Sequence, residues 1–88
     1  MYLRFGGQQI GLRRADGGEH RYYQVGIEHI AFRVDERDEV DQAYERCVAT
    51  GATIHFPPEL DRDVADYYAF FAFDPDGIRV EVSAWDEA

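Results

Sequence analysis

The chain of 88 residues contains no lysine, one cysteine and no long hydrophobic run. Because Cys47 is the only cysteine, the chain cannot hold an internal disulfide framework. Its apolar stretches fall far short of the roughly 20 residues that a transmembrane helix needs. The N-terminus lacks the basic-then-apolar order of a signal peptide. We therefore expect a cytoplasmic protein that does not enter a membrane.

Positive charge is scarce as well, since nine arginines face 18 acidic residues and the net charge is −9. Domains that bind nucleic acid cluster lysine and arginine on one surface. Here the arginines are scattered among acids, so we expect no nucleic-acid partner. The same sign of charge disfavours anionic membrane surfaces. Small-molecule ligands and protein partners remain.

What the chain has in quantity is apolar and aromatic side chains, at 45% and 15% of its residues. That composition indicates a folded domain, and the length fits a single domain over residues 1–88. A chain this short buries only about 60% of the surface that its unfolded form exposes. Such a marginal core favours association with a partner subunit.

Glycine and hydrophobic periodicity divide the chain into a hairpin (1–15), a connector (16–25) and a βαβββ unit (26–84). Gly6-Gly7 between two short apolar runs is typical of a tight hairpin. Alternation over 27–34 predicts a half-buried strand. A helix capped by Asp35 and stopped by Gly51 follows. Strands are predicted at 52–56, 67–73 and 78–82, which gives an α+β fold with a mixed sheet and one main helix.

The alternation also places polar residues on the face of the sheet that the helix does not cover. His29 and Arg33 come to this face from the first strand of the unit, and Arg79 and Glu81 come from the last. An imidazole with a carboxylate suits a first-row divalent metal. From the pattern alone, a solvated polar pair on the wet side of a sheet is the simpler interpretation.

Three stretches together change that weighting: Gly26 to Asp35 (GIEHIAFRVD), Gly51-Ala52, and Phe73 to Val82 (FDPDGIRVEV). They resemble one module of the vicinal oxygen chelate superfamily, which includes glyoxalase I, fosfomycin- and bleomycin-resistance proteins and extradiol dioxygenases. The resemblance covers residues 26–84. It implies that His29 and Glu81 are metal ligands, with Glu81 also able to carry a proton as a catalytic group. The implied cofactor is one divalent ion among Fe, Mn, Ni, Zn and Mg.

The resemblance further implies that two βαβββ modules pair into a cup around the ligand. Residues 1–15 resemble only the last two strands of a preceding module, and Gly11 stands where that module would carry a carboxylate. We therefore expect a homodimer in which each copy supplies His29 and Glu81, because an isologous pair reproduces the twofold arrangement.

Four further residues are expected to contact the ligand. Arg33 and Arg79 would orient an anionic group, and Tyr68 and Phe70, from the aromatic run at 67–73, would stack on a planar one. The expected function is small-molecule binding of the glyoxalase type. Three alternatives stay open: a metal-dependent lyase, isomerase or dioxygenase, a metal-free sequestering protein of the antibiotic-resistance kind, or a non-catalytic module.

Overall fold

The computed structural model describes residues 2–61, 64 and 66–85. A hairpin of β1 (Tyr2–Phe5) and β2 (Gln8–Gly11) comes first. A linker without regular structure leads to β3 (Ile30–Arg33) and α1 (Arg37–Ala49). Then come β4 (Thr53–Leu60), β5 (Tyr68–Phe73) and β6 (Arg79–Ala84). The α+β class, with one helix and a mixed sheet, is confirmed.

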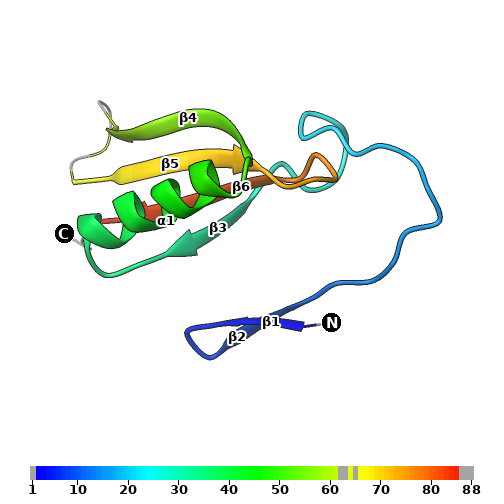
Figure 1. Cartoon of the computed structure of the whole chain (residues 1–88), viewed down its shortest axis with the longest axis horizontal. Coiled ribbons are helices and arrows are strands. Elements are labelled where there is room, and N and C mark those ends of the chain that lie inside the picture. The colour runs from blue at the N-terminus through cyan, green and yellow to red at the C-terminus, as the bar shows by residue number, and fades with distance from the viewer. Residues whose placement is uncertain (1, 62–63, 65, 86–88) are drawn as a thin grey trace.

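The main sheet has the strand order β3-β6-β5-β4, with α1 packed against one of its faces (Figure 1). The first and last strands of the βαβββ unit, β3 and β6, are parallel neighbours, while β5 is antiparallel to both β6 and β4. This pairing matters for function, because it brings residues from the two ends of the unit side by side in one sheet.

The core lies between α1 and the sheet. Val40 of the helix is fully buried against Phe70, Ala72 and Ala84 of β5 and β6. Cys47 packs against this cluster as a small apolar side chain. The opposite face of the sheet, which we call the helix-free face, carries the odd-numbered residues of β5 and β6.

The element boundaries differ from the sequence prediction in two informative places. The helix begins at Arg37 after Glu36, without a side-chain cap, rather than after a capping Asp35. Strand β4 continues through Pro57-Pro58 to Leu60, with two register shifts against β5. Proline is tolerated here because β4 is an edge strand, where a missing N–H breaks no ladder bond, and the shifts absorb the disturbance.

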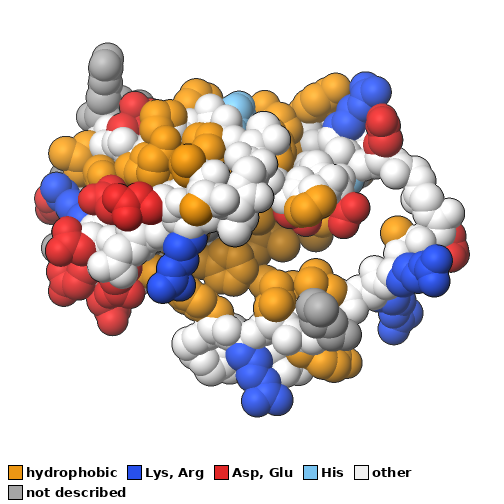
Figure 2. Space-filling view, viewed as in Figure 1, with side chains coloured by type: hydrophobic (Ala, Val, Ile, Leu, Met, Phe, Trp, Pro, Cys, Tyr) orange, Lys and Arg blue, Asp and Glu red, His pale blue; other side chains and the backbone are white. Residues whose placement is uncertain are grey.

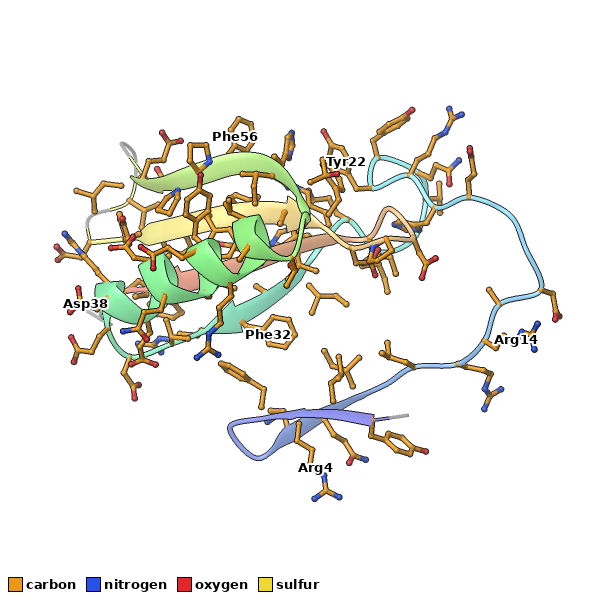
Figure 3. All side chains as sticks on the ribbon, viewed as in Figure 1. Arg4, Arg14, Tyr22, Phe32, Asp38 and Phe56 are labelled. Atoms are coloured by element: carbon orange, nitrogen blue, oxygen red, sulfur yellow. The ribbon has the colours of Figure 1, made fainter. Side chains whose placement is uncertain are left out.

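The hairpin lies apart from the main sheet, alongside the β3 side of it (Figure 1). Gly6 and Gly7, with φ of +53° and +82°, form the tight turn that the sequence predicted. The rings of Phe5 and Phe32 meet edge to face at 5.2 Å, and Figure 3 shows Phe32 directed toward the hairpin. Most hairpin side chains are exposed. Among the described residues, no helix has the length and apolar character needed to cross a membrane.

Candidate functional site

His29 and Glu81 lie next to each other on the helix-free face. His29 directly precedes β3, and the parallel register sets Ala31 opposite Glu81 of β6. The imidazole Nε2 is 3.0 Å from Glu81 Oε1. Glu81 is only 3% exposed, whereas the His29 side chain is 30% exposed. The two ligands expected from the sequence therefore converge, with a buried carboxylate behind a solvent-accessible imidazole.

The second nitrogen of the His29 ring also faces a carboxylate. Nδ1 is hydrogen-bonded to Oε2 of Glu28, and this bond is the largest cause of a lowered pKa at Glu28. With Nδ1 donating to Glu28, Nε2 can face the Glu81 oxygen favourably only when a proton or another cation lies between them. The arrangement is thus selective for a positive charge at that position.

A divalent metal ion fits this pair as half of a site. Metal bonds to imidazole nitrogen and carboxylate oxygen are about 2.0–2.2 Å long, so adjacent ligand atoms lie roughly 3.0–3.5 Å apart. The 3.0 Å separation of Nε2 and Oε1 matches the lower end of that range. Within the residues that the structure describes, no group of three or more His, Cys, Asp and Glu side chains converges. One chain supplies two ligands and a complete site needs more.

The other oxygen of Glu81 is held by Tyr67, which the sequence analysis did not single out. The Tyr67 hydroxyl donates to Oε2, and the phenol ring stacks on Trp85 with an interplanar angle of 13°. Burial raises the pKa of Tyr67, and the neighbouring Glu81 raises it further. Tyr67 therefore stays a neutral donor at physiological pH and fixes the orientation of the carboxylate.

Arg79 reaches this face as expected, but its guanidinium is already engaged. Nη1 donates to Oε1 of Glu28, and Nε donates to Nδ1 of His55 at 3.1 Å. The group also lies 4.0 Å from the ring centre of Phe71 and 5.2 Å from that of Tyr22. With a side chain only 12% exposed, Arg79 is built into the wall of the site. That position does not leave it free to capture an anion alone.

Arg33, the second arginine expected to orient an anionic group, is engaged by Trp85. Its guanidinium lies 3.7 Å from the centre of the Trp85 ring and donates to the Trp85 carbonyl oxygen at 2.7 Å. The structure thus ties Arg33 to the end of β6.

Tyr68 and Phe70 do not face a ligand on the helix-free face, and that expectation is corrected. Phe70 is 1% exposed in the core beneath α1. Tyr68 packs against the same core and donates from its hydroxyl to Asp41 of α1 at 2.6 Å. In an apolar run the odd or even residues can face the helix, and here the even ones do. Tyr67 and Phe71, rather than Tyr68 and Phe70, lie on the helix-free face with Glu81.

A cavity of about 190 Å³ opens on the helix-free face beside the Tyr67–Glu81 pair. Aromatic rings form much of its wall, and two acidic side chains lie at its edge. Ala69, only 5% exposed, leaves the space that a larger side chain would fill. The lining residues are Phe56, Glu59, Asp61, Tyr67, Ala69, Phe71 and Arg79.

Comparison with known proteins shows which family the chain belongs to. A family model described as "Glyoxalase/Bleomycin resistance protein/Dioxygenase superfamily" matches residues 1–82. Among curated proteins, the chain is 34% identical over 67 residues to the uncharacterized protein YqjT of Bacillus subtilis. That match covers 75% of this chain and 52% of YqjT, so the chain spans about half the length of its curated relative.

Solved structures agree on the fold. The genomically encoded fosfomycin resistance protein FosX from Listeria monocytogenes matches with a TM-score of 0.74 and 25% identity, covering 97% of this chain and 64% of FosX. A glyoxalase/bleomycin resistance protein/dioxygenase from Alicyclobacillus acidocaldarius matches with a TM-score of 0.73 and 17% identity, over 98% and 66% of the two chains. The βαβββ topology, the His29–Glu81 pair and the family match lead to one conclusion: the chain belongs to the glyoxalase/bleomycin resistance protein/dioxygenase superfamily.

Proposed function

We propose that this chain is a small-molecule-binding protein in which His29 and Glu81 bind a divalent metal ion and, through it, an oxygen-rich ligand. The observation that carries the proposal is the 3.0 Å approach of Nε2 to Oε1 on the helix-free face. Imidazole with carboxylate suits first-row divalent ions. When bound, the ion would supply Lewis acidity that stabilises negative charge developing on ligand oxygens.

The chain's own residues have distinct roles in this proposal. Glu81 is both a ligand and the group that accepts a proton from the bound molecule, because its carboxylate is buried beside the cavity. Tyr67 keeps the Glu81 carboxylate in place, and the aromatic wall at Phe56 and Phe71 packs on the ligand. A cytoplasmic location, expected from the sequence, stays a prediction.

A second copy of the chain completes the site in the same proposal. One copy brings two ligands, and a twofold pair brings two imidazoles and two carboxylates to a shared ion. Support comes from the ligand count, since the described residues of one chain bring together only one imidazole and one carboxylate at this point, and no group of three metal-binding side chains.

The proposal is tested by titrating metal-free protein with Co²⁺ and following the visible absorption of the bound ion. We expect saturable binding that falls by at least about 100-fold in His29→Ala and Glu81→Gln, because each removes one ligand. His20→Gln is the matched control, since His20 lies in the linker and is expected to leave binding unchanged. Binding that survives both ligand substitutions would contradict the proposal.

A second function, metal-free binding of a planar molecule, is favoured by the aromatic cavity beside Tyr67. Its probes are benzylamine and phenylphosphonate, which share a ring but carry opposite charges. We expect benzylamine to shift the amide resonances of β4 and β5 more, because Glu59 and Asp61 lie at the edge of the cavity. If neither probe binds and no metal ion binds, the result favours the third alternative, a non-catalytic module.

A further inference from the structure

Arg79 lies at the centre of a line of contacts that crosses the helix-free face and ends at the metal-ligand candidates. From His55 on β4, the line runs to the Arg79 guanidinium, from there to the Glu28 carboxylate, and on to the His29 ring. Each contact joins groups of opposite charge or a donor to an acceptor. The line continues from Nε2 of His29 to Glu81.

We infer that Arg79 is a positioning residue, which acts through Glu28 to hold the His29 ring with Nε2 toward Glu81. The inference deepens the proposed function by giving a role to a residue that touches neither the metal nor its ligands. It rests on that function only for its metal readout, since the orientation of the ring is a property of the protein alone.

Glu28 needs such an anchor. Its side chain is 51% exposed, and a glutamate in that setting has several accessible rotamers. A carboxylate on the far nitrogen of a metal-binding imidazole sets the ring's orientation only if the carboxylate is itself fixed. The bond from Arg79 Nη1 to Oε1 leaves Oε2 directed at His29 Nδ1.

Arg79 is suited to be the fixed point. Its side chain is 12% exposed, packed over the ring of Phe71 and facing that of Tyr22. The bond from Nε to His55 leaves it little freedom to rotate. A planar guanidinium can hold two acceptors at a set angle while stacked on a ring, which an ammonium group cannot do.

A direct electrostatic role for Arg79 would have the opposite sign. A guanidinium near a metal site repels the ion, so removing its charge would strengthen metal binding. A positioning role requires that removing Arg79 weaken metal binding, because the ligand ring becomes disordered. The sign of the change therefore separates the two.

The first test measures the order of the His29 ring in metal-free protein, by ¹³C relaxation at Cε1. We expect Arg79→Gln to lower the order of the His29 ring and to leave that of His20 unchanged. Arg33→Gln is the matched control, because it removes the same charge from the same face but its guanidinium lies at Trp85. An unchanged His29 ring in Arg79→Gln would overturn the inference.

The second test is a double-substitution cycle on zinc affinity. Arg79→Gln and Glu28→Gln are each expected to weaken zinc binding about 10-fold or more, the usual effect of losing a partner behind a ligand. Because Arg79 acts through Glu28, the double variant is expected to lie within about 2-fold of Glu28→Gln. Tighter binding in Arg79→Gln, or fully additive losses, would overturn the inference. A wild-type chain that binds no zinc would contradict the proposed function instead, and the ring-order test would still decide the role of Arg79.

Discussion

Nε2 of His29 lies 3.0 Å from Oε1 of Glu81, although the two residues stand at opposite ends of the βαβββ unit. The parallel pairing of β3 with β6 creates this approach, because it makes the first and last strands of the unit neighbours. The helix packs on the other face, so the pair remains accessible from the His29 side. Fold and candidate chemistry are therefore linked by one strand pairing.

Tyr67→Phe removes the donor that holds Oε2 of Glu81. We expect a loss of about 1–2 kcal/mol in the free energy of unfolding, because a buried carboxylate loses a hydrogen bond. Zinc affinity should also fall by several-fold. Urea unfolding and zinc titration of the same variant measure both. Tyr23→Phe is the control, because its exposed hydroxyl accepts a hydrogen bond from Arg21, and an equal loss there would contradict the assignment.

Tyr68→Phe is expected to cost stability in a way that depends on pH. The hydrogen bond to Asp41 raises the pKa of Tyr68 above its ordinary value of 10.0. The folded state thus favours the neutral phenol, and its contribution is fully present below pH 10 and lost as pH rises through the raised pKa.

Urea unfolding should therefore show a deficit of about 1 kcal/mol for Tyr68→Phe at neutral pH. The deficit should shrink at strongly alkaline pH. Tyr2→Phe, on the exposed hairpin, is the control and should leave the stability at neutral pH unchanged. A deficit for Tyr68→Phe that grows with pH would contradict this account.

Ala69→Leu is expected to fill the cavity beside Tyr67 and abolish benzylamine binding, because the added atoms occupy the space that Ala69 leaves. Zinc binding should change less, since Ala69 pairs with Ser83 of β6, whereas the proposed metal ligand Glu81 pairs with Phe71. Amide shift titrations with benzylamine measure the loss. Ala49→Leu, at the exposed end of α1, is the matched control. Full benzylamine binding by Ala69→Leu would show that the cavity is not the ligand site.

We expect the N-terminal segment 1–15 to strengthen the proposed dimer electrostatically. It carries Arg4, Arg13 and Arg14 and no acid, for a charge of +3, so the remainder carries −9 − 3 = −12. None of the three makes an ion pair with another described residue, whereas Arg21, Arg37 and Arg79 each do. Figure 3 shows Arg4 and Arg14 directed away from the main sheet. In Figure 2, acidic side chains gather at one end of the part formed by the main sheet and α1.

Arg13→Gln/Arg14→Gln should therefore weaken dimerisation about 10-fold, since each exposed ion pair contributes about 0.2–1 kcal/mol. The wild-type dimer should also weaken with salt. Sedimentation equilibrium at low and high salt measures both effects. Arg21→Gln/Arg46→Gln makes the same charge change outside this segment, and an equal weakening there would rule out a specific role for the segment.

The sequence predicted the elements and the His29–Glu81 pair because both follow from local patterns. Alternation assigned each strand face where one side is polar, as in β3 and β6, and the family resemblance gave the pair its chemistry. The run Tyr67–Phe73 is apolar on both sides, so alternation cannot tell which residues face the helix. The register decides, since Phe71 pairs with Glu81 and shares its face.

The contacts of Glu28 and Arg79 were beyond the sequence for a different reason. Glu28 and His55 are remote from Arg79 along the chain, and no spacing rule connects them. Their meeting depends on the pairing of β4, β5 and β6 and on the path of the linker before β3. Strand β4 likewise crosses two prolines because it became an edge, which is a property of the whole sheet.

Native mass spectrometry of protein purified without chelator or affinity metal tests the central claim most directly. The account predicts a dimer that holds one divalent ion per pair of chains and loses it in His29→Ala. A metal-free dimer would contradict the metal role of His29 and Glu81. A monomer, with or without an ion, would contradict the site shared between two copies.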